Sequence, residues 1–285
     1  MNAPARPHRV PLALGPVART LLVPLWARAE ETRRADGVLH DPKAVEIVAA
    51  IDFDFTVLRE AQASQLGCCV RAALVDAWVR EFLAQHPSGT VIELGVGLNS
   101  RHERLDNGRA HWVELDLPEV IALREHFFAP GARRTLVAGS ITDAATLDAL
   151  HTHSDRPCLV VSEGVLVYLD EPAARAVFAR LHAALPGAAF VFDAMTPAVL
   201  RFQGGHDAMR HFDARFTWSV ADPRDVEAFA PGITLERSHN FYDLLYAHPE
   251  RLPRWMRAAG PVVSRAWPAV RHCYTINLAR FGAGR

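Results

Sequence analysis

The chain has 285 residues, of which 50% are hydrophobic, and its formal net charge is −1. This length suits one large domain with a sizeable core, and the balanced charge gives no signal for a nucleic acid or a membrane as partner. Lys43 is the only lysine, which excludes a P-loop and argues against Schiff-base chemistry. The four cysteines show no C-x-x-C spacing, so we expect buried thiols in a reducing, cytoplasmic setting.

The first part of the chain is predicted to be helical. Residues 1–17 are rich in proline and are expected to be loose or draped over the body. A helix is predicted over 17–34, and prolines together with Arg19 exclude residues 11–27 as a membrane span. A second helix is expected to begin at Pro42 with Asp41 as its N-cap, and a long amphipathic helix to cover 64–85. We assign residues 1–60 to an N-terminal helical extension and residues 61–285 to the main domain.

Strands and helices alternate after this helical part. Such alternation predicts a parallel sheet with helices on both faces. The last strand alternates in the manner of an antiparallel one, so we expect an α/β, Rossmann-like fold whose mostly parallel sheet ends in a C-terminal antiparallel hairpin. The predicted strands are 90–95, 110–115, 134–138, 157–162, 188–193, 233–238 and 273–281; the predicted helices are 118–128, 143–151, 171–185, 221–230 and 249–259.

An irregular segment over 195–218 interrupts this alternation. It is rich in Phe, Arg and His around Gly204 and Gly205. A long segment without a regular pattern inside a compact domain is usually a lid or a binding loop. We therefore predict a lid here, with the two glycines as its hinge.

A glycine-rich turn follows the first predicted strand. The pattern is E-x-G-x-G, with Glu93, Gly95 and Gly97. Glycine allows a sharp turn with positive φ and a close approach of a ligand to the backbone. In open α/β sheets, ligands bind outside the carboxyl ends of the strands. Ser100 stands where a dinucleotide-binding fingerprint would have its third glycine, so a plain strand-to-helix turn stays the alternative.

Asp116 ends the second predicted strand, about 20 residues after the glycines, which is the usual spacing for a carboxylate that binds ribose hydroxyls. An ionised carboxylate can accept from both hydroxyls at once. The alternative is an N-cap in front of Pro118, and the two roles are compatible.

Three stretches in this order, 93–101, 114–120 and 163–169, resemble the leucine carboxyl methyltransferase family. The similarity is greatest to its branch of bacterial polyketide O-methyltransferases of the tetracenomycin type, which also shares a leader like residues 24–30 followed by Asp41-Pro42. The resemblance covers about residues 20–195. It implies an enzyme that binds S-adenosylmethionine on a seven-stranded sheet and O-methylates a small, polyketide-like metabolite.

The resemblance also implies the cofactor site. Arg71 resembles the arginine that pairs with the cofactor carboxylate, with an ordinary surface arginine as the alternative. Glu163 resembles the acid near the amino group of the cofactor, with a capping or ion-pairing carboxylate as the alternative. Relatives carry Asp at the positions of Asn99 and Ser140, so adenine binding is expected to depend more on apolar packing. The implied cofactor-binding residues are Arg71, Glu93, Gly95, Gly97, Asp116, Leu117, Ser140, Ile141 and Glu163.

A carboxylate is the expected methyl acceptor, because it is ionised at neutral pH and needs no general base. A phenol would benefit from a base, and the candidates His206, His211 and His272 are each as well explained by packing or surface positions.

Tyr168 is predicted to orient the nucleophile as a catalytic residue, with core packing as the alternative. No metal spacing is present. The arginines expected to bind an acidic substrate are Arg201, Arg210 and Arg215 of the lid, and Arg28.

Two other classes remain open from the sequence. One is a nicotinamide-dependent oxidoreductase on a similar sheet, which the missing third glycine and the 163–169 motif disfavour. The other is a cofactor-binding protein that has lost methyl transfer. The oligomeric state has no signal in the sequence.

Overall fold

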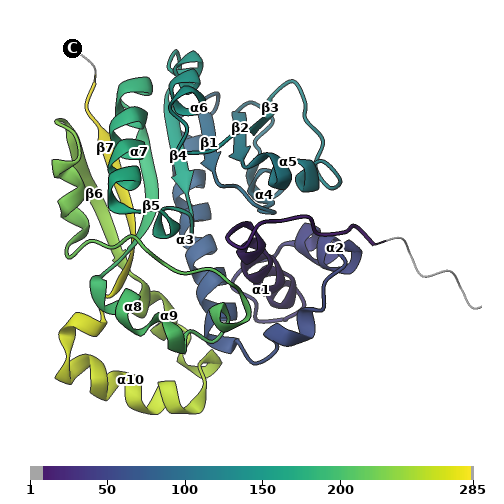
Figure 1. Cartoon of the computed structure of the whole chain (residues 1–285), viewed down its shortest axis with the longest axis vertical. Helices are drawn as coiled ribbons and strands as arrows, with labels where there is room; N and C mark the ends of the chain where they lie inside the picture. Colours follow the sequence, from purple (N-terminus) through teal and green to yellow (C-terminus); the bar gives the residue numbers. More distant parts are fainter. Residues whose placement is uncertain (1–8, 284–285) are drawn as a thin grey trace, which may run out of the picture.

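The computed structural model describes residues 9–283 and contains a seven-stranded sheet in the order β3-β2-β1-β4-β5-β7-β6 (Figure 1). The first five strands are parallel, β7 is antiparallel to β5, and β6 is antiparallel to β7. The predicted Rossmann-like sheet with a C-terminal antiparallel hairpin is thus confirmed. The strands are β1 (Thr90–Leu94), β2 (His111–Asp116), β3 (Arg134–Ala138), β4 (Cys158–Ser162), β5 (Ala189–Met195), β6 (Ile233–Asn240) and β7 (Tyr274–Phe281).

The helices surround the sheet, and none of those in residues 9–283 is long and apolar enough to cross a bilayer. Two of them begin at the expected aspartate N-caps, since Asp41 accepts from the Ala44 N–H at 3.0 Å and Asp170 accepts from the Ala173 N–H at 2.8 Å. The helices are α1 (Leu22–Thr32), α2 (Pro42–Ala50), α3 (Gln62–Gln85), α4 (Arg101–Leu105), α5 (Pro118–Arg124), α6 (Ala144–Asp148), α7 (Glu171–Ala184), α8 (Pro197–Phe202), α9 (Phe241–Tyr246) and α10 (Arg254–Ala266).

Several predicted elements differ from those observed. Three short helices, α4, α8 and α9, were not predicted. The segment 221–230 forms only a 3-10 turn over Pro223–Ala228. The helix predicted over 249–259 begins at residue 254 and continues through Pro261 to residue 266. Gly260 and Pro261 predict a break in this helix, but the helix continues through both residues. Contact with α9 requires the glycine, because a Cβ on Gly260 would lie 1.6 Å from the Tyr246 hydroxyl.

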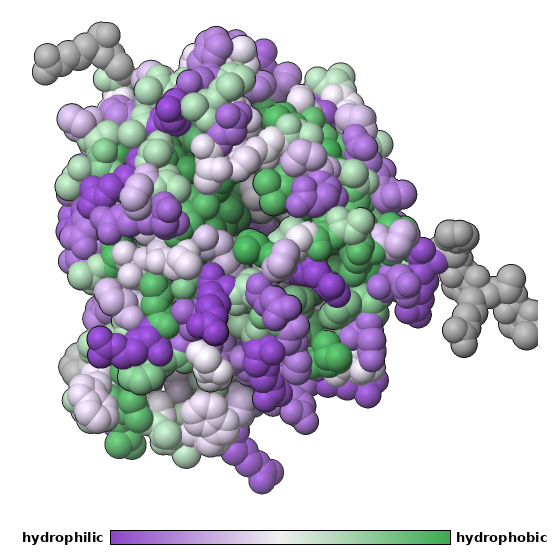
Figure 2. All heavy atoms as spheres, in the orientation of Figure 1, coloured by the Kyte–Doolittle hydropathy of each residue, from purple (hydrophilic) through white to green (hydrophobic). Residues whose placement is uncertain are grey.

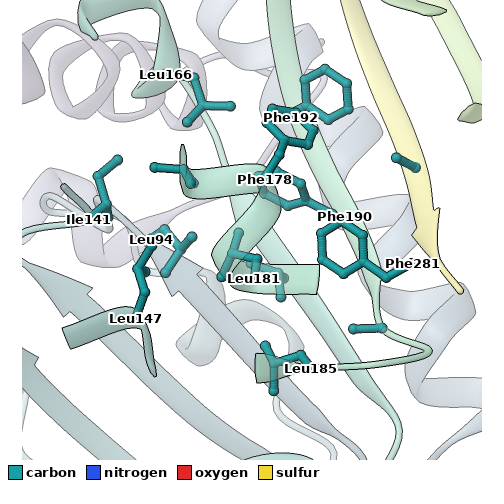
Figure 3. Packing of buried hydrophobic residues seen from close by; sticks show 14 of the residues in the cluster. Leu94, Ile141, Leu147, Leu166, Phe178, Leu181, Leu185, Phe190, Phe192 and Phe281 are labelled. Atoms are coloured by element: carbon teal, nitrogen blue, oxygen red, sulfur yellow. The ribbon is translucent and has the colours of Figure 1, made fainter. Parts of the chain in front are cut away.

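The central parallel strands β1, β2, β4 and β5 are buried on both faces, as strands between two layers of helices must be. On one face α7 fills the core with Phe178, which packs at 5.0 Å, ring centre to ring centre, on both Phe190 and Phe192 of β5 (Figure 3). On the other face α3 packs Trp78 and Val79 against alternate residues of β1, β2, β4 and β5. Because β1 to β5 run parallel, their carboxyl ends lie at one edge of the sheet.

The N-terminal helices pack on α3 and on the turn after β1. A cluster of buried residues joins Leu22 and Leu25 of α1 to Leu98 after the glycine turn. Val10 pairs with Ile51 in a β-bridge, so the described part of the proline-rich segment lies on the body, while residues 1–8 fall outside the described part. The boundary near residue 60 between an extension and the main domain stays a prediction.

Candidate active site

The order of the strands reverses between β1 and β4, where a ligand-binding crevice is expected in an open α/β sheet. At this edge β1 ends at Leu94, β2 at Asp116 and β4 at Ser162. The glycine turn, Asp116 and Glu163 therefore lie at neighbouring strand ends. In the orientation of Figure 1, this face of the molecule has a hollow near its middle, lined in part by hydrophobic atoms (Figure 2).

The turn after β1 requires its glycines. Gly95 and Gly97 have φ values of 64° and 53°, and a Cβ on Gly95 would lie 2.5 Å from a methyl carbon of Val165. The Asp116 carboxylate holds this turn, since it accepts from the Gly97 N–H at 2.6 Å and from the Leu117 N–H at 2.7 Å. The expected N-cap role of Asp116 is wrong, because its side chain does not cap α5.

Asp116 keeps the capacity to bind a further donor. A carboxylate has about four lone-pair sites, and two backbone N–H groups use two of them. Burial raises the pKa of Asp116, and the N–H groups of Gly97 and Leu117 oppose this rise. The remaining sites fit the two hydroxyls of a ribose.

Arg71 lies at the site rather than on the surface, so the alternative of an ordinary surface arginine is wrong. Its Nε donates to Glu163 at 2.9 Å and its Nη1 donates to the Tyr274 hydroxyl at 2.7 Å, with Asp193 at 3.5 Å. Its Nη2 has no hydrogen-bond partner among residues 9–283 and lies 3.1 Å from the position of a Cβ on Gly164. This open cationic edge, beside a glycine, fits a carboxylate ligand.

Glu163 is an ion-pairing carboxylate as well as a candidate ligand. Arg71 binds one of its oxygens and Arg101 binds the other, at 2.6 Å. Burial opposes its ionisation, but the two guanidinium groups outweigh this effect and lower its pKa to about 2. Glu163 is therefore a fixed negative charge at neutral pH, which suits an ammonium group.

Arg101 is a fully buried arginine beneath this site. It donates to Asp76 at 2.7 Å and also binds Glu93 and Glu163. Burial raises the pKa of Glu93, with Arg101 opposing the rise. The Oε2 atom of Glu93 is buried and has no partner among the described residues. An orphaned acceptor at the base of the glycine turn fits a donor from a bound cofactor.

Sequence reasoning missed four residues of this network: Arg101, Asp76, Asp193 and Tyr274. Asp193 lies in β5 and Tyr274 begins the antiparallel β7, directly opposite Met195. The Tyr274 hydroxyl donates to Asp193, and Asp193 accepts from the Gly164 N–H at 2.8 Å. The rule that strand carboxyl ends meet at one edge could have found Asp193, because it stands near the end of a predicted strand.

Of the residues predicted to flank the adenine, Ser140 already uses its hydroxyl in hydrogen bonds within the protein. The Ser140 hydroxyl lies 2.8 Å from the Thr142 hydroxyl and accepts from the Thr142 N–H at 3.2 Å, so it is engaged in a local turn. Ile141 is buried in the core beside the sheet, and Leu117 is half-buried. Apolar contact with these two residues remains the prediction for this part of the site.

Tyr168 lies in a 3-10 turn after β4. Its ring packs on Phe216 at 5.4 Å between centroids, and its hydroxyl lies 3.7 Å from the Met209 sulfur. Burial raises its pKa to about 12, so the hydroxyl stays protonated at neutral pH. A protonated hydroxyl can donate a hydrogen bond but cannot take up a proton as a base.

The lid segment is anchored at several points. Trp218 is fully buried, and Asp207 accepts from the N–H of Ser64 at the start of α3 at 3.2 Å. Arg201 and Arg215 are exposed and form no ion pair among the described residues, whereas Arg210 pairs with Glu60 at 3.3 Å.

The fourth predicted substrate arginine, Arg28, lies in a different environment. It is buried, and it donates to Asp41 at 2.8 Å and to the Leu98 carbonyl at 2.9 Å. Its position favours a structural role, so the proposed substrate site omits it.

Tyr274→Phe is expected to weaken cofactor binding about 5- to 30-fold, because Arg71 loses a hydrogen-bond partner worth about 1–2 kcal/mol. Isothermal titration with S-adenosylhomocysteine measures this effect. Tyr242→Phe is the matched control, since that hydroxyl bonds to the Ser264 hydroxyl, away from Arg71. Unchanged affinity in Tyr274→Phe would remove this hydroxyl from the network that orients Arg71.

Comparisons with known proteins agree with this geometry. A family model described as leucine carboxyl methyltransferase matches residues 22–182. The tetracenomycin polyketide synthesis O-methyltransferase TcmP of Streptomyces glaucescens is 32% identical over 262 residues, which are 91% of this chain and 95% of that protein. The S-adenosyl-L-methionine-dependent methyltransferase dpfgK of Gibberella zeae is 30% identical over 241 residues, 75% of this chain and 78% of that protein.

Solved structures support the fold. A crystal structure from Thermobifida fusca YX, of a protein assigned as a methyltransferase, superimposes with a TM-score of 0.56 at 16% identity and covers 90% of this chain and 94% of that one. At this identity the likeness concerns the fold alone.

Proposed function

Because the chain belongs to the leucine carboxyl methyltransferase family and is an S-adenosylmethionine-dependent methyltransferase, we propose that it methylates a carboxylate oxygen of a small, polyketide-like metabolite. When bound, the cofactor supplies a methyl group already activated on a sulfonium. Arg71 would bind its carboxylate, Glu163 its amino group and Asp116 its ribose. The name of the Streptomyces relative supports oxygen as the acceptor and a polyketide as the substrate class.

The surroundings of the three candidate base histidines are the observation that favours a carboxylate over a phenol as the methyl acceptor. His206 accepts the Met209 N–H at its Nδ1, so the neutral ring carries its proton on Nε2 and has no free lone pair. Burial lowers the pKa of His206 and keeps the ring neutral. His211 accepts from the Arg210 Nε at 3.1 Å, and His272 lies in a cavity of about 250 Å³ beside β6.

A phenol, with a pKa about 10, would benefit from one of these rings as a base, whereas a carboxylate is ionised at neutral pH. With a carboxylate as acceptor, the protein needs only to position the carboxylate oxygen against the methyl group and to exclude water. The Tyr168 hydroxyl would donate to the acceptor and orient it. The free state of the four cysteines supports our proposal that the enzyme works in a reducing cytoplasm.

The test is to incubate the protein with S-adenosylmethionine and matched panels of aromatic acids and phenols, and to detect the gain of one methyl by mass. We expect a methyl ester, which mild alkali cleaves, and a rate that stays level from neutral to mildly alkaline pH. An alkali-stable ether, or a rate that rises toward the pKa of a phenol, would contradict the carboxylate proposal and leave methyl transfer in place.

The lid arginines are expected to recognise the charge of the substrate. Arg201→Ala or Arg215→Ala should raise KM for an acidic substrate at least about 10-fold without changing cofactor affinity, because a charged hydrogen bond is worth about 1.5–3 kcal/mol. Steady-state kinetics measures this effect, and Arg180→Ala on the exposed face of α7 is the control. If Arg201→Ala, Arg215→Ala and the third lid variant, Arg210→Ala, all keep the wild-type KM, the recognition charge lies elsewhere.

A further inference from the structure

Buried arginines bind three consecutive carbonyl groups of the glycine turn. The Arg124 Nη1 donates to the Gly97 carbonyl at 3.0 Å and to the Asn99 carbonyl at 2.7 Å. The Arg28 Nη2 donates to the Leu98 carbonyl, which lies between them in the chain, at 2.9 Å. Arg124 is fully buried and Arg28 is 3% exposed. These bonds therefore form away from bulk water, where the loss of a partner is costly.

The N-terminal helices contact the turn at further points. Arg28 is a residue of α1. Leu21, directly before α1, packs on the turn, since a Cβ on Gly97 would lie 3.3 Å from the Leu21 Cβ. Asp41, the N-cap of α2, accepts from the Ser100 hydroxyl at 2.5 Å. In Figure 1, α1 and α2 lie below α4 and α5. The helices before residue 60 thus form one wall of the glycine turn.

Each of the two guanidinium groups also binds a carboxylate. The Arg28 Nε donates to Asp41 at 2.8 Å, and the Arg124 Nε donates to Glu114 at 3.0 Å. A guanidinium is planar and its N–H groups point in fixed directions. The carboxylate therefore determines where the remaining N–H groups of each arginine point, and a lysine could not replace both contacts at once.

A bound carbonyl fixes its whole peptide group, because the peptide bond is planar. The two arginines thereby orient the peptide groups that follow Gly97, Leu98 and Asn99. Asp116 holds the beginning of this stretch, since it accepts from the Gly97 N–H at 2.6 Å. The turn is thus held along its length by side chains from the N-terminal helices, β2 and α5.

Arg124 also acts on the carboxylate that is expected to bind the ribose. Burial raises the pKa of Asp116, and the N–H groups of Gly97 and Leu117 and the charge of Arg124 oppose this rise. A cation at this place favours the ionised carboxylate, which can accept from two hydroxyls.

We propose that Arg28 and Arg124 are positioning residues for the cofactor, which hold the glycine turn in the shape that binds S-adenosylmethionine. Through Arg28, α1 becomes part of the cofactor site. A turn without these contacts has to be ordered when the cofactor binds, and the lost conformational entropy lowers the affinity. The proposal rests on the cofactor site described above and is independent of the methyl acceptor.

Calorimetric titration of the whole chain with S-adenosylhomocysteine, without any acceptor, tests the proposal. Arg28→Lys should weaken binding about 10-fold, because a lysine can stay paired with Asp41 but cannot also reach the Leu98 carbonyl in the geometry of the guanidinium. Arg124→Lys should act in the same direction. Thermal unfolding reports whether each variant is folded, and Arg28→Lys decides the test alone if Arg124→Lys does not fold.

Arg251→Lys is the matched control, because Arg251 holds the same helix without touching the turn. Its Nη1 and Nη2 bind the two carboxylate oxygens of Glu31 in α1, at 3.1 Å and 2.6 Å, and both side chains are buried. If Arg28 served only to pack α1 on the body, Arg251→Lys would weaken cofactor binding as much as Arg28→Lys. We expect Arg251→Lys to bind S-adenosylhomocysteine like the wild type.

Hydrogen exchange of the cofactor-free protein provides a second measurement. Residues 95–100 should lose protection in Arg28→Lys and in Arg124→Lys, and keep it in Arg251→Lys, because only the first two variants release carbonyls of the turn. A role limited to overall stability would instead raise exchange throughout α1 and α3 without singling out the turn.

Wild-type affinity for S-adenosylhomocysteine in Arg28→Lys overturns the proposal, as does an equal loss of affinity in Arg251→Lys. Unchanged protection of residues 95–100 in Arg28→Lys would overturn it as well. A wild type that does not bind S-adenosylhomocysteine would instead contradict the cofactor site itself, so the two failures are distinguishable.

Discussion

Replacing Arg101 with methionine is expected to lower the free energy of unfolding by about 3–5 kcal/mol. The substitution leaves Asp76, Glu93 and Glu163 buried without the cation that they share. Urea denaturation at pH 7 measures the change. Arg180→Met is the control, because its ion pair with Asp148 is exposed and should contribute less than about 1 kcal/mol.

The pH dependence identifies the cause of that loss. The folded-state pKa of Glu163 is about 2, below the ordinary value of 4.5, so the stability it contributes is complete above pH 4.5 and is lost as the pH falls toward 2. Without Arg101 the pKa of Glu163 rises and this contribution shrinks. The difference in stability between wild type and Arg101→Met should therefore narrow as the pH falls from 4.5 to 2. A constant difference across that range would assign the loss to packing alone.

Asp116→Ala is expected to weaken binding of S-adenosylmethionine by on the order of 2–4 kcal/mol, at least about 30-fold, because two charge-assisted hydrogen bonds to the ribose are lost. The mutation also frees the Gly97 and Leu117 N–H groups that hold the glycine turn. Calorimetric titration measures the affinity, with the exposed Asp148→Ala as the matched control. Wild-type affinity in Asp116→Ala would remove this carboxylate from the cofactor site.

Measuring both cofactor affinity and stability for Asp116→Ala and Arg101→Met should separate the loss of a cofactor ligand from the loss of a buried ion-pair network. Asp116 is engaged by two backbone N–H groups, whereas Arg101 binds three buried carboxylates. We expect Asp116→Ala to reduce cofactor affinity more than stability, and Arg101→Met to reduce stability more than affinity. A variant pair with equal losses in both measurements would show that the turn and the buried network unfold together.

Strand and motif positions were predictable because they depend on local periodicity. Buried parallel strands are short apolar runs, and each of the predicted strands lies within about two residues of an observed one. The glycine turn and Asp116 were predictable for the same reason, since they stand at strand ends. The helix that runs through Gly260 and Pro261 was not, because local propensity predicts a break there, and the close packing of Gly260 on Tyr246 is visible only in the tertiary structure.

By itself, the sequence determined the α/β sheet, the carboxyl-end location of the site and the family to which the chain belongs, since each depends on residues close together in the chain. Only the tertiary structure decided how the charges pair. Arg71, Asp193 and Tyr274 are separated by more than 80 positions from one another, yet they form one network. It also placed Arg28 in the interior against Asp41. A buried charge must find a partner of opposite sign, and packing of distant elements, not local sequence, determines which one is within reach.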